Sequence, residues 1–191
     1  ILRAQLRWGL GQVSDAMADL ARAAELAPRQ TQALSLRASM LVELRRFDEA
    51  IADADRIAAL DPVAVDPLIV RLDAAMMAGH GDLDAAYAMT HRLEAAAAGD
   101  PRALPLAFRF RAQIMQRQGD LDGAMAAANR AVKLMPGAAW PYALRAGVLG
   151  ERIRGAVDDR AARLVLPLIS DVNSAIMLGD QGAELRALRA S

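Results

Sequence analysis

The sequence predicts an all-α fold in which pairs of short helices stack side by side as a solenoid. A triplet of one large residue, one charged residue and alanine recurs at regular intervals: five copies begin 34, 36, 38 and 34 residues apart, a period that fits two short helices. The copies begin at Leu2, Leu36, Leu72, Phe110 and Leu144. No segment alternates apolar and polar residues at period two, so strands are not expected. Alanine, the best helix former, supplies 44 of the 191 residues.

The repeat predicts five helix pairs in chain order. The first helices of the pairs are expected near 1–10, 31–44, 67–79, 103–118 and 138–153. The corresponding units are 1–28, 29–62, 63–101, 102–136 and 137–180, the last with an insertion at 152–166. A polar segment, 181–191, is expected to cap the end of the stack, as terminal repeats must. Because residue 1 already lies in a first helix, we expect the chain to be part of a longer one.

Each unit carries the same internal signals. Alanines such as Ala38 and Ala50 recur where two helices must approach closely, and leucine and isoleucine recur at three- and four-residue spacing from Leu34 to Leu60. Gly81 and Gly119 can adopt the left-handed conformation that ends a helix, and the aspartate after each can cap the next helix. Prolines at 28, 62, 101 and 136 mark the ends of units.

Two segments depart from this regularity. Residues 63–67 are expected to lengthen the connection between the second and third units, and residues 94–100 to extend the second helix of the third unit. A larger break follows Arg154, where about ten extra residues precede Pro167 and the return of a second-helix pattern.

These units resemble the tetratricopeptide repeat family, in an array of the bacterial type. The resemblance rests on four units that share the triplet, a turn such as Gly119-Asp120, a following alanine such as Ala124, and a closing proline. It implies antiparallel helix pairs wound as a right-handed superhelix. It also implies that the first helices line a concave surface that binds a peptide or protein.

The residues expected on that surface are those of the first helices turned away from the partner helix. They are Gln5, Trp8, Ser35, Ser39, Val42, Arg71, Ala75, Ala78, Arg109, Gln113, Gln116, Ala143, Gly147 and Gly150. Arg71 and Arg109 are expected to converge on one carboxylate or phosphate. Some relatives clamp a peptide's terminal carboxylate with lysine and asparagine. Here arginines replace the lysines, and Ala75 and Gln113 stand at the asparagine-type sites, so that particular function is not expected.

Arginines and aspartates at repeated positions predict structural ion pairs within units. The pairs are Arg3–Asp19, Arg37–Asp53 and Arg145–Asp171, each joining a first helix to its second helix. A planar guanidinium suits a two-point contact with a carboxylate. The third and fourth units lack the pattern, because Asp73, Met89 and Ala127 replace the expected residues.

Composition limits the remaining function classes. The 23 basic residues balance the 23 acidic ones, which argues against nucleic acid or an anionic membrane as the partner. No apolar run approaches the ~20 residues that span a bilayer, so no membrane insertion is expected. The absence of cysteine excludes disulfides and leaves the compartment open between cytoplasm and periplasm.

The residues that could serve in catalysis or metal binding fit structural roles instead. His80 and His91 lack the spacing of a metal site. The Gly-Asp-Leu-Asp segments at 81–84 and 119–122 are too short for a calcium loop and fit a turn with a helix cap. Asp158 and Asp159 fit the start of a helix. No cofactor is expected, and we interpret the segment as a non-enzymatic scaffold or adaptor for a protein or peptide. The alternatives are an accessory domain of a larger enzyme and a self-associating scaffold.

Overall fold

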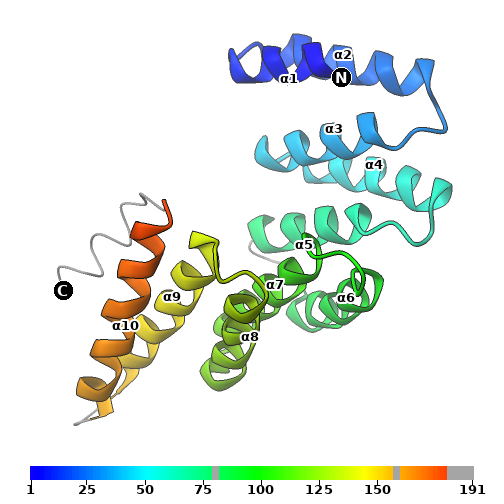
Figure 1. Cartoon of the computed structure of the whole chain (residues 1–191). Helices are drawn as coiled ribbons and strands as arrows, with labels where there is room; N and C mark the ends of the chain where they lie inside the picture. The colour runs from blue at the N-terminus through cyan, green and yellow to red at the C-terminus, as the bar shows by residue number, and fades with distance from the viewer. Residues whose placement is uncertain (79–81, 157–159, 180–191) are drawn as a thin grey trace. The chain divides into compact units, whose positions relative to one another are not determined.

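The computed structural model describes residues 1–78, 82–156 and 160–179, and this part of the chain contains ten α-helices and no strand. The helices are α1 (Leu2–Gly9), α2 (Val13–Leu26), α3 (Gln32–Glu43), α4 (Phe47–Leu60), α5 (Asp66–Ala78), α6 (Leu83–Ala96), α7 (Leu104–Arg117), α8 (Leu121–Leu134), α9 (Ala139–Gly155) and α10 (Arg160–Met177). The all-α prediction is therefore confirmed (Figure 1). The five predicted first helices agree with the structure within two residues at each end.

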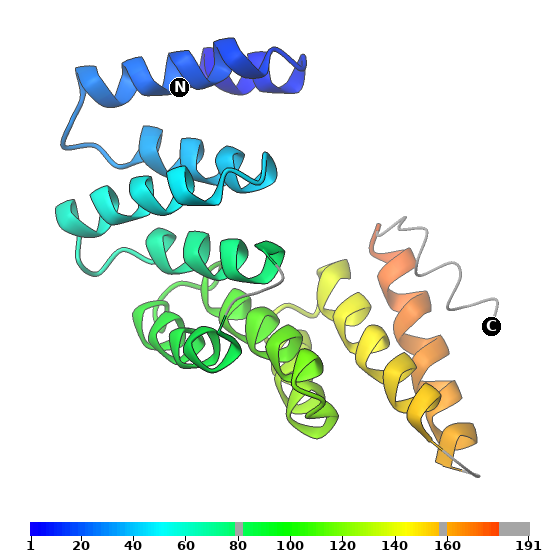
Figure 2. The same ribbon diagram turned by 180° about the vertical axis from the view of Figure 1, so that it is seen from behind.

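The chain divides into two compact units, Ile1–Ala96 and Ala97–Ser191. The first unit holds α1 to α6, in which each odd-numbered helix packs on the helix that follows it (Figure 2). The second unit holds α7 to α10 as two further pairs. Consecutive pairs within a unit also pack on each other, α3 on α2 and α9 on α8.

Alanine permits the close approach of the paired helices. The predicted contact alanines Ala38, Ala50 and Ala124 are completely buried, as are Ala112 and Ala131 in the second unit. A methyl side chain lets the helix axes approach closely, and larger residues then fill the space between pairs. In the first unit, one such cluster joins Ala4, Leu20 and Met40 from three successive helices. Leu60, which we expected in the buried stripe, is 44% exposed because it ends α4.

The turns inside the pairs follow the sequence prediction where the structure describes them. Gly119 has a φ of 79°, and Asp120 accepts a hydrogen bond from the Gly123 amide at 2.9 Å, capping α8. Asp82 caps α6 in the same way by accepting from the amides of Asp84 and Ala85. In the second pair the left-handed position is occupied by Arg45, with a φ of 58°. Gly81 lies outside the described residues.

The irregular segments differ from expectation. The connection before α5 is no longer than the one before α3, and the two additional residues instead lie in the first turn of α5. Helix α6 has the same 14 residues as α2 and α4, so the extra residues after Glu94 form a longer connection to α7. The expected insertion at 152–166 is largely helical, because α9 continues to Gly155 and α10 begins at Arg160 with Pro167 inside it. Asp158, Asp159 and the tail 181–191 lie outside the described residues.

Candidate binding groove and structural ion pairs

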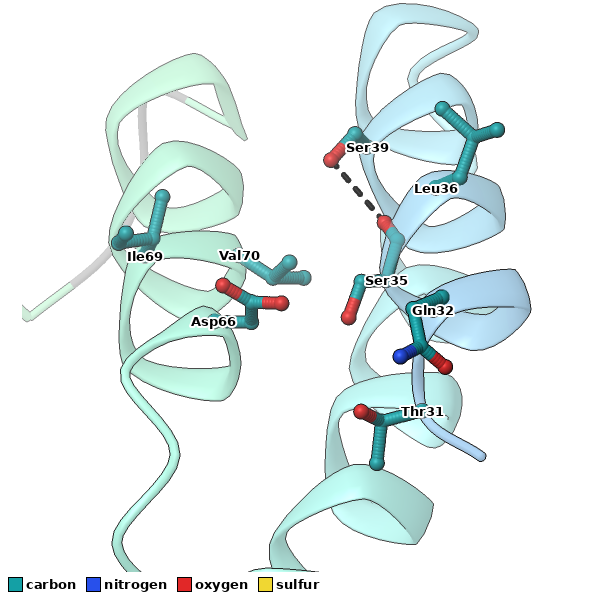
Figure 3. A pocket seen from close by; sticks show the side chains of 8 residues that line it. All are labelled: Thr31, Gln32, Ser35, Leu36, Ser39, Asp66, Ile69 and Val70. Atoms are coloured by element: carbon teal, nitrogen blue, oxygen red, sulfur yellow. Dashed lines mark hydrogen bonds between the residues drawn. The ribbon is translucent and has the colours of Figure 1, made fainter. Parts of the chain in front are cut away.

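A groove of about 340 Å³ runs between the first helices of the second and third pairs (Figure 3). Its walls come from α3 and α5 and consist of Thr31, Gln32, Ser35, Leu36, Ser39, Asp66, Ile69 and Val70. This groove is therefore lined by two of the residues predicted for the concave surface, Ser35 and Ser39. The groove combines apolar walls with hydroxyl, amide and carboxylate groups.

Helix periodicity places these side chains on facing surfaces. Ser35 and Ser39 are one turn apart on α3, and the Ser39 hydroxyl donates to the Ser35 carbonyl oxygen at 3.1 Å. The Ser35 hydroxyl oxygen is buried and has no hydrogen-bond partner among the described residues. Figure 3 shows the Asp66 carboxylate reaching from α5 toward the same space. A hydroxyl both donates and accepts, so Ser35 can bond either group of a peptide backbone.

Arg71 lies on a different face of α5 from the groove. Ile69 and Val70 face α3, and each residue turns the helix by about 100°, which carries Arg71 away from α3. Its guanidinium pairs instead with Asp55 of α4. The structure thus does not place Arg71 with Ser35 and Ser39.

The other predicted groove residues lie on all five first helices, α1, α3, α5, α7 and α9. Val42 of α3 is buried in a core cluster with Ala38 and Leu41, so it is not part of a surface. Gln5 is exposed, and Trp8 is half-buried against the cluster of Ala4, Leu20 and Met40. The residues of α7, Arg109, Gln113 and Gln116, are half-buried in the second unit. The Arg109 guanidinium carbon lies 4.6 Å from the ring centroid of Phe110. Their part in a binding surface, and the convergence of Arg109 with Arg71, stay predictions.

The three arginine–aspartate pairs lie within hydrogen-bonding distance. Arg37 donates from Nε and Nη2 to the two carboxylate oxygens of Asp53 at 2.6 and 2.5 Å, and the Asp53 side chain is only 2% exposed. Arg3 contacts Asp19 in the same two-point manner at 2.7 and 2.5 Å. These bonds raise the pKa of Arg37 and Arg3 above the ordinary value. The hydrogen bond from Arg3 lowers the pKa of Asp19 below its ordinary value.

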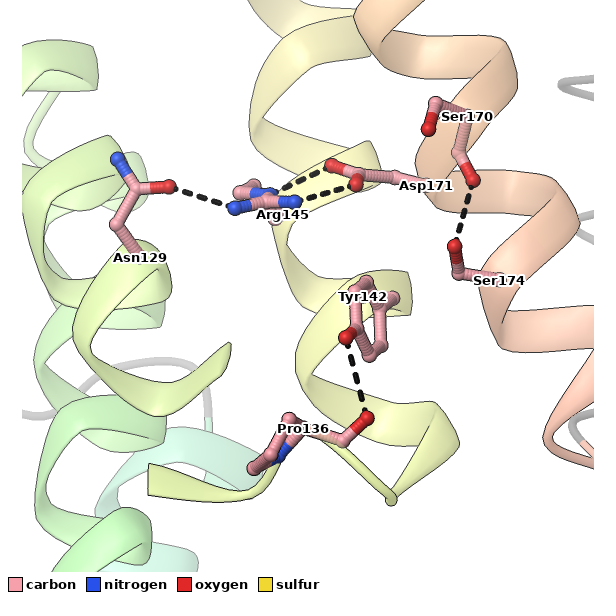
Figure 4. A network of polar contacts seen from close by, with 7 residues as sticks. All are labelled: Asn129, Pro136, Tyr142, Arg145, Ser170, Asp171 and Ser174. Carbon is pink, nitrogen blue, oxygen red and sulfur yellow. Dashed lines mark hydrogen bonds and ion pairs between the residues drawn. The ribbon is translucent and has the colours of Figure 1, made fainter. Parts of the chain in front are cut away.

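The third pair, between α9 and α10, is part of a larger network (Figure 4). Arg145 of α9 donates to Asp171 of α10 at 2.7 and 2.6 Å, and the third guanidinium nitrogen, Nη1, donates to Asn129 of α8 at 2.9 Å. The hydrogen bonds to Asp171 raise the pKa of Arg145. One guanidinium thus joins three successive helices.

Sequence reasoning missed several partners in these pairs. Arg7, which stands at the repeat position that Leu41 holds in the second pair, forms a second ion pair with Asp19 at 2.7 Å. The Asp55–Arg71 and Asn129–Arg145 contacts were not anticipated. A signal existed, because both join residues 16 apart, the separation of Arg3–Asp19 and Arg37–Asp53.

Among the residues considered for catalysis or metal binding, His91 is described by the structure and makes a packing contact. His91 packs edge-on against Tyr87, with ring centroids 5.0 Å apart. His80 lies outside the described residues. Within the described ranges, no three histidine, cysteine, aspartate or glutamate side chains come together as a metal-binding set.

Comparison with known proteins supports the fold at low sequence identity. The sequence matches no protein-family model and no curated protein sequence. The chain is similar in structure to the tetratricopeptide repeat protein TTC0263 of Thermus thermophilus, with a TM-score of 0.75 and 16% identity over 100% of this chain and 95% of that one. It is also similar to PilF of Pseudomonas aeruginosa, with a TM-score of 0.75 and 14% identity over 98% of this chain and 78% of that one.

A third similar structure is a tetratricopeptide repeat protein from Parabacteroides merdae, with a TM-score of 0.74 and 20% identity over 98% of this chain and 67% of that one. The chain therefore has the fold of a tetratricopeptide-type helical repeat array. None of the helices in the described ranges has the length and apolarity that crossing a membrane requires.

Proposed function

We propose that the protein is an interaction scaffold that binds a peptide or protein partner along the first helices, with the groove between α3 and α5 as the contact site. The observation that supports this proposal is the groove itself, because it lies between two first helices, the elements that the resemblance implies for binding, and it includes Ser35 and Ser39. A tetratricopeptide-type array offers such surfaces between successive pairs.

The chemistry of the groove favours an extended polypeptide. Ile69 and Val70 offer apolar contact, while the exposed Ser39 hydroxyl and the Asp66 carboxylate offer hydrogen-bonding groups. A peptide backbone supplies amide donors for these oxygens, and its side chains supply apolar surface. The balanced net charge supports a protein partner over nucleic acid, whose binding relies on many phosphate contacts.

Filling the groove tests this proposal. Ser39 is exposed on α3, so Ser39→Trp should block the groove without disturbing the core, and Ala52→Trp on the exposed surface of α4 is the matched control. Partners that co-purify with the wild-type chain would be identified, made as pure proteins and measured by calorimetry. We expect Ser39→Trp to weaken binding at least about tenfold and Ala52→Trp to leave it unchanged. Equal affinity in the three proteins would refute the groove as the binding site.

Self-association is the alternative that a specific observation favours. Leu2, Leu6 and Leu10, along α1 and just after it, are 72%, 62% and 74% exposed, which leaves a row of apolar side chains in water. With a net charge of zero, two copies do not repel each other. If a second copy covers this face, light scattering should show a dimer that Leu6→Glu converts to a monomer. A wild-type chain that stays monomeric up to high concentration would exclude it.

A further inference from the structure

A second pocket, of about 410 Å³, lies on the opposite side of α5 from the groove. It is bounded by the end of α4, the connection after it, the first turns of α5, and the last turn of α6. The α5 residues that line it, Pro67, Leu68 and Arg71, differ from those that line the groove, Asp66, Ile69 and Val70. The two depressions share no residue, so one helix presents separate faces to each.

The first turn of α5 forms part of this pocket. Pro67 and Leu68 line it together with Val63 of the preceding connection and Ala95 of α6. The remaining lining residues are small or apolar apart from two arginines. The floor therefore fits a compact apolar group.

The charge of the pocket is positive. Arg71 and Arg92 both line it, and no acidic side chain is among the lining residues. Arg71 is bonded to Asp55 through Nη2, which leaves most of its five N–H donors available. Arg92 makes no hydrogen bond or ion pair with any residue that the structure describes. A cation without an anionic partner in that part of the chain, beside an apolar floor, favours an anionic ligand with an apolar body.

We propose that this pocket binds a carboxylate carried on a small apolar group. Arg92 and Arg71 bind the carboxylate oxygens, and the side chains of Leu68, Val63 and Ala95 surround the apolar group. Charge-assisted hydrogen bonds from arginine to a carboxylate are about twice as strong as neutral ones. The volume lies within the range of small-ligand pockets, roughly 300–1,000 Å³. The last residue of a polypeptide and a free short branched carboxylic acid share this chemistry.

Nuclear magnetic resonance titration of the full chain with four probes tests the proposal. N-acetylleucine represents the end of a polypeptide, and 4-methylpentanoate represents a free acid with the same apolar body. The neutral 4-methylpentanamide lacks the charge, and acetate lacks the apolar body. We expect saturable shifts of the amides of Leu68 and Ala95 with at least one of the first two probes, and about tenfold weaker binding of the last two. The tighter of the first two probes identifies the source of the ligand.

Two variants localise the binding. Arg92→Gln should weaken the binding of the better probe about tenfold, whereas Arg29→Gln, at an exposed arginine outside the pocket, should bind it as the wild type does. Ala95→Leu should fill the pocket and abolish binding while the helical circular dichroism is retained. The proposal is overturned if neither acid binds, if the neutral amide binds as tightly, or if Arg92→Gln has no effect. Ser39→Trp does not alter this pocket. A negative result for carboxylate binding in the pocket can therefore be distinguished from a negative result for peptide binding in the groove.

Discussion

Single guanidinium groups connect helices in this protein, and their effect depends on how many close partners the carboxylate has. Asp53 is 2% exposed and has one close partner, Arg37, because the next arginine, Arg56, lies 3.8 Å away. Asp19, whose side chain is 9% exposed, has two arginines within 2.7 Å. A buried carboxylate that loses its only close partner keeps its desolvation cost, whereas one with a second close arginine keeps an ion pair. Arginines at equivalent positions of the repeat therefore contribute differently to the free energy of unfolding.

Replacing Arg37 by leucine should show this difference. Arg37→Leu leaves the Asp53 carboxylate buried without its main partner, so we expect a loss of about 1–3 kcal/mol in the free energy of unfolding, measured by urea denaturation. The double variant Arg37→Leu/Asp53→Leu should recover much of the loss. Arg3→Leu is the comparison, because Arg7 still holds Asp19 there. If Arg3→Leu proves as costly as Arg37→Leu, the second arginine at Asp19 does not compensate for the loss of the first.

Asp19 should contribute stability that acid removes. Its pKa is lowered in the folded chain by the hydrogen bond from Arg3, so the unfolded chain takes up the proton first as pH falls. The stabilisation is complete above the unfolded pKa of about 4 and is lost as pH falls through the lower folded value. The melting-temperature difference between the wild type and Asp19→Asn should therefore shrink between about pH 6 and pH 2.5. A constant difference across that range would contradict this assignment.

At the scale of one element, the end of α3 carries a conformation that its residue disfavours. Arg45 has a φ of 58°, at the repeat position where Gly11 and Gly119 stand in other pairs. It also donates to the carbonyl of Met77 at 3.0 Å and lies 5.6 Å from the Phe47 ring centroid, contacts that glycine cannot make. The backbone strain and these contacts act in opposite directions.

Comparing Arg45→Gly with Arg45→Ala separates the two effects. Both variants lose the side-chain contacts, but only alanine retains the cost of the left-handed conformation, about 1 kcal/mol. We expect the glycine variant to be the more stable by that amount in thermal unfolding followed by circular dichroism. Equal stability of the two variants would show that the turn relaxes when the arginine is removed.

At the scale of the whole molecule, repeat architecture predicts that parts of the chain fold alone. Residues Ile1–Ala96 form a compact unit with their own buried clusters, such as that of Ala38, Leu41 and Ala54. Because each repeat contacts mainly its neighbours, a segment of three helix pairs needs no distant contact. A fragment of residues 1–96 should show the helical circular dichroism spectrum and a cooperative melting transition. An unfolded fragment would mean that the second unit is required.

The fold was predictable from the sequence because small residues set helix spacing in every repeat. Ala38, Ala50 and Ala124 fix the period and are fully buried, so pattern and structure agree. The candidate site was predictable only in part. Ser35 and Ser39 line the groove, whereas Arg71, the repeat equivalent of Ser35, does not. A groove between two neighbouring helices takes facing residues from each, and equivalent positions in successive repeats point in the same direction and so do not face each other.

The junction at Arg145 has a consequence for how stability is shared along the second unit. Because one guanidinium bonds both Asn129 of α8 and Asp171 of α10, the contact inside one helix pair and the contact between pairs depend on the same group. Substitutions at Asn129 and Asp171 should then be non-additive although their helices are separated by α9. In a linear chain of repeats, such a shared group adds to the interaction energy between neighbouring repeats. It therefore favours unfolding of α8, α9 and α10 as one cooperative segment.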